Sequence, residues 1–218
     1  MAFGLNKVAS ETTRLLQGLG LSRRDVSDAG LAALQRLAAE RDALAERLAA
    51  AEALADRDTL TPVLNRRGFL RELHRTMSEV ERYKTPAAVI FIDLDGFKAL
   101  NDCYGHAAGD AVLSAVGRLL LDSVRESDVV GRLGGDEFGV ILNRASAEEA
   151  TAKAAALNHK LNATPVVFAG VSHRVRGSFG VHAIAMSEDP EAAIARADEA
   201  MYAEKYARRE QAQAFAAF

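Results

Sequence analysis

The stretch AAVIFIDLDGFK, from Ala87 to Lys98, passes from an uninterrupted apolar segment into two carboxylates. Such a run is typical of a strand buried on both faces, and a strand of this kind delivers polar groups to the rim of its sheet. Asp93 and Asp95 are two residues apart, so both side chains point to the same face. The segment alone also fits a polar turn at a strand end. Taken as a strand, it predicts a central sheet with acids at one edge.

A second acidic group follows in RLGGDEFGV, at Arg132–Val140, between two strand-like segments. The two adjacent glycines predict a tight hairpin turn with positive φ angles. Asp136 and Glu137 are expected to leave this turn on opposite faces, so that at most one converges with Asp93. A solvated hairpin tip is the alternative for this stretch taken by itself.

Carboxylates brought this close repel one another unless cations neutralise them. Clusters that offer only oxygen atoms suit Mg²⁺ or Mn²⁺, and the lack of a histidine cluster argues against zinc. An EF-hand is excluded, because Lys98 and Tyr104 stand where such a loop needs Gly and Glu. The glycine-rich signatures of P-loop and Rossmann nucleotide sites are also missing.

Strands and helices alternate after residue 57, which indicates an α/β or α+β domain with one central sheet. We expect a helix at 65–84, a strand at 87–95, a helix at 108–123, strands at 128–133 and 137–142, a helix at 146–162, a hairpin across 165–184, and a last helix from Pro190 to about Arg209.

Residues 1–57 contain no proline and are rich in Ala, Leu, Arg and Glu, so they are expected to be helical. Ser22 and Asp25 resemble a capping box, which predicts a long helix from Arg23 to about Arg57. A coiled-coil spacing is formed by Leu34, Leu37, Arg41, Leu44, Leu48, Ala51 and Ala55. Self-association is favoured over a hairpin with residues 5–17, because a helix this long outreaches so short a partner.

The 218 residues are 49% hydrophobic, enough for one ordinary domain and an appendage. A net charge of −3 and a pI of about 6.0 give no general attraction to nucleic acid or anionic lipid. Cys103 is the only cysteine, and the longest apolar run, Ala87–Ile92, is too short to cross a bilayer. A cytoplasmic protein with no membrane span and no nucleic-acid partner is therefore expected.

Five segments, in order and spacing, resemble the GGDEF domain of diguanylate cyclases: LTPVLNRRGF, FIDLDGFKALNDCYGHAAGD, RESDVVGRLGGDEF, GSFGV and ADEAMYAEK. The resemblance covers about residues 58–209. It implies synthesis of cyclic di-GMP from two GTP molecules, on a mostly antiparallel sheet wrapped by helices, similar to the palm of nucleotide cyclases and polymerases. Residues 1–57 would then be a helical dimerisation or regulatory segment, and residues 210–218 a flexible tail.

The resemblance also assigns roles to individual residues. It implies two Mg²⁺ (or Mn²⁺) ions per active site, and it leaves open whether Glu137 acts as a base. The metal ligands would be Asp93, Asp136 and the carbonyl of Leu94, and the catalytic turn would comprise Gly134, Gly135, Asp136 and Glu137. Guanine would be selected by Asn101 and Asp110, and phosphates would be contacted by Phe97, Lys98, Lys205 and Arg209.

Because each domain would bind one GTP, the resemblance requires a homodimer with two domains face to face. Arg125 and Asp128 match the family's inhibitory product site for cyclic di-GMP; without the resemblance, a local surface salt bridge between them is the alternative. Two departures stand out: residues 145–173 contain no arginine for a second inhibitory contact, and Arg208 replaces a usual glycine.

Two other classes of function remain open at this point. One is a catalytically silent GGDEF module that binds GTP or cyclic di-GMP and signals through a protein partner at the N-terminal helices. The other is a coiled-coil adaptor whose GGDEF domain is incidental. Intact acidic and guanine-site positions favour the active enzyme.

Overall fold

The computed structural model of the chain describes residues 16–18 and 20–216, without the side chains of residues 23, 49–54, 209 and 211–216. The chain forms two compact units, Met1–Leu54 and Ala55–Phe218. The expected first helix, at residues 5–17, lies almost wholly outside the described residues. None of the helices in the described part combines the length and apolarity needed to cross a membrane.

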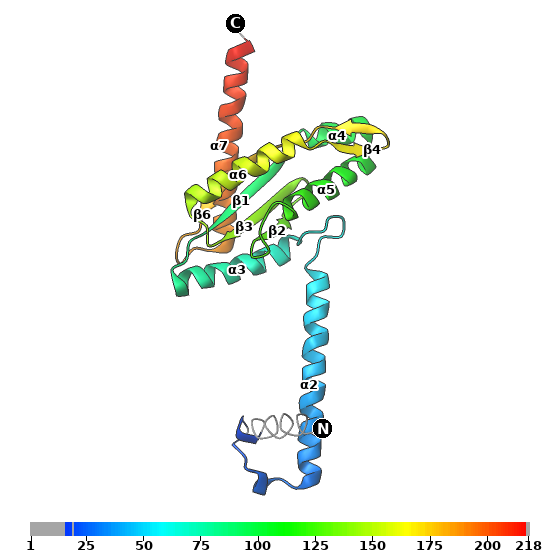
Figure 1. Ribbon diagram of the computed structural model, residues 1–218, viewed down its shortest axis with the longest axis vertical. Helices are drawn as coiled ribbons and strands as arrows, with labels where there is room; N and C mark the ends of the chain where they lie inside the picture. The colour runs from blue at the N-terminus through cyan, green and yellow to red at the C-terminus, as the bar shows by residue number, and fades with distance from the viewer. Residues whose placement is uncertain (1–15, 19, 217–218) are drawn as a thin grey trace. The chain divides into compact units, whose positions relative to one another are not determined.

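The long helix of the first unit, α2 (Asp28–Ala55), starts later than expected (Figure 1). Ser22 and Asp25 do form a capping box, in which the Ser22 backbone N–H donates to Asp25 Oδ2 at 2.8 Å. They cap a separate 3-10 turn, Arg23–Asp25, and Val26 then adopts an extended conformation that ends it. The expected start of the long helix directly after Ser22 is therefore wrong.

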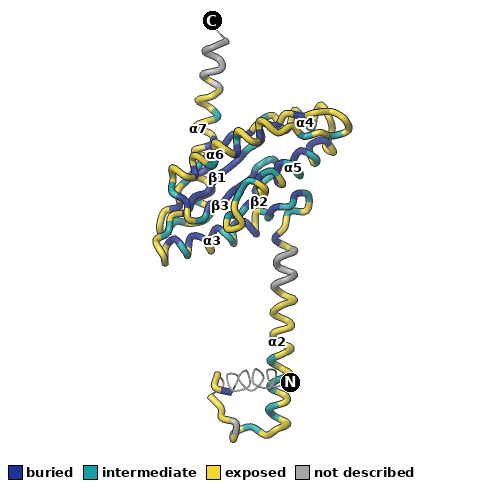
Figure 2. Tube along the Cα trace, viewed as in Figure 1, coloured by how far each residue is buried: buried dark blue, intermediate teal, exposed yellow. Residues whose placement is uncertain are grey.

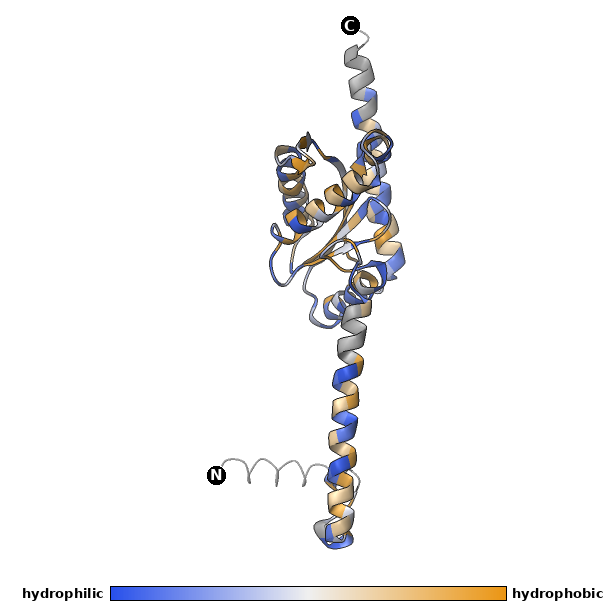
Figure 3. Ribbon diagram, turned by 90° about the vertical axis from the view of Figure 1, so that its right-hand side faces the viewer, coloured by the Kyte–Doolittle hydropathy of each residue, from blue (hydrophilic) through white to orange (hydrophobic). Residues whose placement is uncertain are grey.

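Apolar side chains lie exposed along α2. Figure 3 shows hydrophobic residues alternating with hydrophilic ones along this helix. At the expected coiled-coil positions Leu37, Leu44 and Leu48, the exposed fractions are 61%, 57% and 60%. Leucines exposed to this extent at seam spacing are available to pack against a second helix.

The second unit is built on a four-stranded sheet in the order β2-β3-β1-β6, and every neighbouring pair is antiparallel (Figure 1). Its elements are α3 (Arg66–Tyr83), β1 (Ala87–Asp95), α4 (Phe97–Tyr104), α5 (His106–Leu121), β2 (Val129–Arg132), β3 (Glu137–Asn143), α6 (Ala147–Ala163), β4 (Val166–Phe168), β5 (Val171–His173), β6 (Arg176–Ala183) and α7 (Pro190–Ala216). The expected antiparallel sheet wrapped by helices is confirmed.

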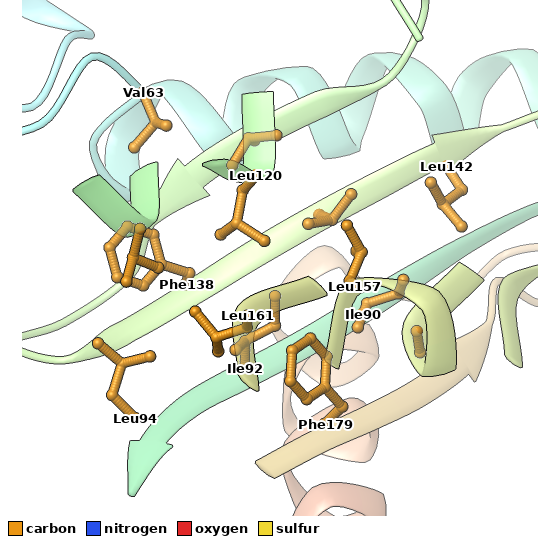
Figure 4. Close-up of a cluster of buried hydrophobic side chains, with 14 of the residues drawn as sticks. Val63, Ile90, Ile92, Leu94, Leu120, Phe138, Leu142, Leu157, Leu161 and Phe179 are labelled. Atoms are coloured by element: carbon orange, nitrogen blue, oxygen red, sulfur yellow. The ribbon is translucent and has the colours of Figure 1, made fainter. Parts of the chain in front are cut away.

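Strand β1 is buried on both faces, as its apolar sequence predicts (Figure 2). Ile90 and Ile92 pack into the core beneath α5 and α6, together with Phe138 of β3 (Figure 4). Val89 and Phe91 point to the opposite face and pack into the core formed with α3 and α7. The alternating side chains of β1 thus pack into one core on each face of the sheet. Asp93 and Asp95 continue the same alternation, so they lie on the face of Val89 and Phe91.

Helix α4 was not expected: no element was predicted between the strand at 87–95 and the helix at 108–123. It lies between Gly96 and Gly105, whose φ angles of 74° and 80° mark its ends. It is only eight residues long, so Phe97 and Leu100, which pack against the core, give too short a pattern to predict a helix. The following helix, α5, consequently starts at His106 instead of near residue 108.

Residues 165–184 form two separate pairings instead of the single expected hairpin. Strands β4 and β5 make a two-stranded sheet of their own, whereas β6 joins the edge of the main sheet beside β1. Helix α7 continues to Ala216, past the end expected near Arg209.

We predict that Gly180→Ala destabilises the second unit, because α7 approaches β6 closely at this glycine. A Cβ on Gly180 would lie 2.0 Å from the carbonyl oxygen of Ala197 and 2.2 Å from the backbone nitrogen of Met201. The helix backbone must move to admit the methyl group, at a cost of about 1–3 kcal/mol or more in the free energy of unfolding.

Denaturant titration of the full chain measures this cost. The control is Gly18→Ala, where a Cβ would have no atom within 4 Å. An unchanged unfolding midpoint for Gly180→Ala would contradict the close approach.

Candidate active site

The two acids of β1 lie at the end of the strand, on the face that packs against α3 and α7. Asp93 pairs in register with Glu137 of β3 on one side and with Ser178 of β6 on the other. The side chains of Asp93 and Asp95 are 22% and 24% exposed, so they are partly shielded from water. The sheet edge therefore presents both carboxylates together, as predicted.

The connection between β2 and β3 is a four-residue loop, residues 133–136, in which the Leu133 N–H donates to the Glu137 carbonyl at 2.8 Å. Neither Gly134 nor Gly135 has a positive φ angle, so the expected reason for the glycines is wrong. Space is the reason at Gly134, where a Cβ would lie 2.1 Å from Glu137 Oε2. A Cβ on Gly135 would meet no atom within 4 Å.

Arg132 holds the loop in place. Its guanidinium donates from Nη2 to the Gly135 carbonyl at 2.6 Å, and Nη1 lies 3.3 Å from Asp58 Oδ1. Asp58 in turn accepts from the Thr61 N–H at 2.8 Å, which fixes the segment before α3. Burial alone would raise the pKa of Asp58, but the Thr61 hydrogen bonds and the charge of Arg132 lower it. Sequence reasoning missed both residues of this pair; a charged residue ending an apolar strand was the available signal.

Negative charge accumulates around the loop. Partial burial, followed by repulsion from Asp93, raises the pKa of Asp136. Burial also raises the pKa of Glu137, with further repulsion from Asp136, Asp198 and Asp93. The expectation that only one of the two loop acids approaches Asp93 is therefore wrong. Asp136 belongs to the loop instead of the strand, so strand alternation does not direct it away.

Two cations from α7 face these acids. Lys205 Nζ donates to Asp93 Oδ1 and lies 3.5 Å from Asp95 Oδ1. Burial would lower the pKa of Lys205, but its bonds to the two carboxylates raise it. Arg208 Nη2 lies 2.8 Å from Asp95 Oδ2 and 2.6 Å from Ser178 Oγ. Sequence reasoning noted Arg208 only as a departure and did not assign it to the site.

The side chain of Arg209 lies outside the described residues, so its expected convergence with Lys205 stays a prediction. Lys98 is exposed at the start of α4, next to Phe97. The first backbone N–H groups of α4 follow Gly96, which has no side chain to cap them. These groups are oriented as donors at a helix start, a favourable place for a phosphate.

The donor set fits a divalent cation, although no group of three Asp, Glu, His or Cys side chains within the described residues is placed to hold a metal by itself. Asp93 and Asp136 supply two carboxylates, and Leu94 supplies a neighbouring carbonyl. All three offer oxygen, which Mg²⁺ and Mn²⁺ prefer. Burial, and after it repulsion from Asp93, raises the pKa of Asp136, and a cation bound between the two carboxylates would neutralise this repulsion.

An unpaired acceptor lies between α4 and α5. The Oδ1 atom of Asn101 is buried and has no hydrogen-bond partner. Gly109 leaves it room, since a Cβ there would lie 1.9 Å from this oxygen and 3.1 Å from Phe97 Cζ. Asp110 follows Gly109 and is exposed. A buried acceptor without a donor is rare in native structures, so the Oδ1 atom of Asn101 is a candidate acceptor for a ligand. Asn101 itself lies within α4.

Arg125 and Asp128 line a separate pocket of about 360 Å³ between the β2–β3 sheet edge and α6. Asp128 accepts from the backbone N–H groups of Arg125 at 3.0 Å and Asn143 at 3.2 Å. The guanidinium of Arg125 makes no hydrogen bond or ion pair with any described residue. The alternative of a local salt bridge between the two side chains is therefore wrong, and Lys153 adds a second cation to the pocket.

Comparison with known proteins shows which proteins this chain is similar to. Residues 55–211 match the family model described as "Diguanylate cyclase, GGDEF domain". The probable diguanylate cyclase DgcE of Escherichia coli K12 is 40% identical over 152 residues, which cover 69% of this chain and 14% of DgcE. The chain thus spans a small part of that relative's length.

Two solved structures extend the likeness into the N-terminal segment. The coiled coil and GGDEF domain of DgcB from Caulobacter crescentus, in complex with c-di-GMP, is 27% identical with a TM-score of 0.69, covering 81% of this chain and 94% of that one. Diguanylate cyclase SiaD of Pseudomonas aeruginosa, in complex with its activator SiaC, is 28% identical with a TM-score of 0.69, covering 94% and 78%.

We predict that Asp136→Asn raises the melting temperature of the metal-free chain at neutral pH, by up to about 2 °C because the group is only partly buried. The folded state raises the pKa of Asp136 above its ordinary value of 3.8, so its ionised form destabilises the fold at higher pH. This penalty develops as the pH rises from 3.8 through the folded pKa, and it is absent below 3.8. Thermal melts in EDTA across this range measure it.

Asp58→Asn is the opposite-sign control. Its carboxylate has a lowered pKa in the folded state, so its charge stabilises the fold above the folded pKa and the substitution should lower the melting temperature at neutral pH. A lower melting temperature for Asp136→Asn under the same conditions would refute the inferred repulsion.

Proposed function

The chain belongs to the GGDEF domain family of diguanylate cyclases, and we propose that it condenses two GTP molecules into cyclic di-GMP and two pyrophosphates. One observation carries the proposal: Asp93 and Asp136 meet at the end of the central strands and repel each other, beside a loop whose backbone is open at Gly135. A structural role would favour neutralising such acids, whereas a metal-dependent transfer of a nucleotidyl group uses them.

The residues of the site divide the work in this proposal. Asp93, Asp136 and the carbonyl of Leu94 hold the metal, and Glu137 adds a carboxylate next to them. When bound, two Mg²⁺ (or Mn²⁺) ions supply the charge that neutralises the triphosphate and lowers the pKa of the attacking 3′-hydroxyl. Gly135, where a Cβ would meet no atom within 4 Å, lets the α-phosphate approach the backbone of the loop, and Gly134 leaves room for the carboxylate of Glu137 beside it.

Lys205 has two successive partners in the reaction we propose. In the free protein it pairs with Asp93, and on substrate binding it exchanges this carboxylate for the triphosphate. The backbone N–H groups at the start of α4, near Phe97, and the side chains of Lys98 and Arg209 complete the phosphate contacts.

Guanine is selected between α4 and α5 in this proposal. The unpaired Oδ1 of Asn101 accepts a donor from the guanine edge, and Asp110 accepts the other donors. Adenine lacks this pair of donors, and it would leave the buried oxygen of Asn101 unsatisfied. The cost of an unsatisfied buried acceptor, about 1–3 kcal/mol, favours GTP over ATP.

The reaction needs two copies of the site, each holding one GTP. The exposed leucines of α2 provide the self-association surface that we propose for the homodimer. The likeness to DgcB, whose solved structure includes a coiled coil, supports this role. The likeness to SiaD, solved with an activator protein, supports regulation by a protein partner that engages the N-terminal helices.

Product inhibition is the regulation that we propose at Arg125 and Asp128. Arg125 offers a free guanidinium fork for the guanine or phosphate of cyclic di-GMP, and Asp128 offers a carboxylate held in place by backbone donors. Lys153 on α6 stands in the same pocket and supplies the second positive charge in a segment that has no arginine.

The test of the main proposal is incubation of the full chain with GTP and Mg²⁺, followed by chromatography for cyclic di-GMP. We predict product from the native chain and a rate lower by about 100-fold or more in Asp136→Asn, because a charge that stabilises the transition state is lost. Asp122→Asn, at an exposed position beyond α5, is the matched control and should keep the native rate.

Replacing Leu37, Leu44 and Leu48 by Gln should lower the rate per subunit at low protein concentration and restore it at high concentration, if α2 drives dimerisation. If the native chain made no cyclic di-GMP at any protein concentration, the proposed cyclase activity would be refuted. In that case, GTP binding without turnover would identify a silent nucleotide-binding module.

We further predict that Arg125→Ala converts more GTP before the reaction slows, because bound product is retained less. Progress curves at equal initial GTP measure the effect, which should be a rise of about tenfold in the product concentration giving half inhibition. Arg82→Ala, another exposed arginine, is the control. Identical progress curves for Arg125→Ala and the native chain would rule out inhibition at this pocket.

A further inference from the structure

A third pocket lies beside the acids, where β6 begins and α6 ends. Its volume is about 440 Å³, and it is lined by Asp95, Asn162, Arg174, Arg176 and Arg208. Three of these five side chains are arginines, and only one is acidic. A water molecule takes about 30 Å³, so the pocket has room for a di- or triphosphate group with its hydration.

The positive charge of the pocket is not neutralised from within. Its one carboxylate, Asp95, already pairs with Arg208 at 2.8 Å and lies 3.5 Å from Lys205 Nζ. The side chains of Arg174 and Arg176 make no hydrogen bond or ion pair with any described residue. Two guanidinium groups therefore remain without a partner in the pocket.

Local structure holds these arginines where they are. Val175 between them is buried, with 5% of its surface exposed, so Arg174 and Arg176 project to the solvent side together. Arg176 pairs in register with Asp95, which brings it to the end of β1. Arg208 is fixed from α7 by Asp95 and by Ser178 Oγ at 2.6 Å. The three arginines thus reach one pocket from β6, from the segment just before it, and from α7.

We propose that Arg174, Arg176 and Arg208 form a phosphate-binding pocket for the terminal phosphates of an oligophosphate. A guanidinium presents a planar fork of donors that matches phosphate oxygens, and several forks together favour a polyanion over a single phosphate. The chemistry admits two sources: the triphosphate of GTP bound at the neighbouring acids, or free pyrophosphate. The first source rests on the proposed function, and the second does not.

Asp95 acts as a positioning residue in this pocket. It accepts from Ser178 Oγ at 2.9 Å and orients Arg208. Its charge is consumed by this anchoring, so it does not repel the phosphate as a free carboxylate would. The guanidinium of Arg208 is therefore positioned for phosphate binding, with little repulsion between the phosphate and the carboxylate of Asp95.

Calorimetric titration of the full chain with inorganic pyrophosphate in EDTA tests the pocket without requiring activity. We expect binding by the native chain and at least about tenfold weaker binding by the Arg174→Ala/Arg176→Ala variant, because charge-assisted hydrogen bonds are lost. The matched control is Arg82→Ala/Arg118→Ala, which removes two exposed arginines from α3 and α5 and should bind as the native chain does. Pyrophosphate binding that is weakened equally in both variants, or that is unchanged in both, would overturn the proposal.

Kinetics then distinguish the two sources. If the pocket holds the triphosphate of GTP, Arg174→Ala/Arg176→Ala raises KM for GTP by about tenfold and leaves kcat within about twofold. If it holds free pyrophosphate, KM stays unchanged and inhibition by added pyrophosphate weakens by a similar factor. Unchanged KM together with unchanged pyrophosphate inhibition would overturn the pocket's role. A chain that makes no cyclic di-GMP would refute the proposed function, while the titration in EDTA would still decide on the pocket.

Discussion

The antiparallel pairing of β1 with β3 on one side and β6 on the other is the constraint on which the second unit depends. This register places Asp93 beside Glu137 and Ser178, and the burial of β1 on both faces leaves its last residues no freedom to turn away. A slip of one residue would move the acids to the opposite face and Val89 and Phe91 out of their core. The geometry of the acids is therefore enforced by hydrophobic packing far from them.

The cost of gathering these carboxylates is offset by helix α7. Asp136 and Glu137 have raised pKa values, which shows that the fold tolerates their charges without neutralising them fully. Lys205 and Arg208 supply compensation on the side of Asp93 and Asp95. The uncompensated charge is concentrated at the loop, and the positive surplus is concentrated beside β6. An asymmetry of this kind suits a ligand that carries both a cation and phosphates.

Much of the fold and site followed from local sequence patterns. The apolar run of β1, the acids at its end, and the strands around the loop could be predicted because burial and alternation leave clear signals. The helix α4 could not be predicted, because its eight residues are too few for a clear helical pattern. The loop glycines were expected to supply positive φ angles, yet neither has one, and Gly134 lies against the carboxylate of Glu137. Arg132, Asp58 and Ser178 were missed because their partners lie far away in the chain.

Helix α7 makes apolar contacts in its first half and polar contacts in its second half, and the two halves therefore differ in local stability. Ala193, Ala197 and Met201 are buried in the core, whereas Tyr202 and Tyr206 are 65% and 55% exposed. Beyond Met201 the helix is tied to the sheet mainly by polar contacts to acids of β1, which weaken in salt. Fraying of the C-terminal half, or a proteolytic cut within it, would remove the cations and leave the hydrophobic core closed. Substrate phosphates that engage these cations would in turn protect the helix end from protease.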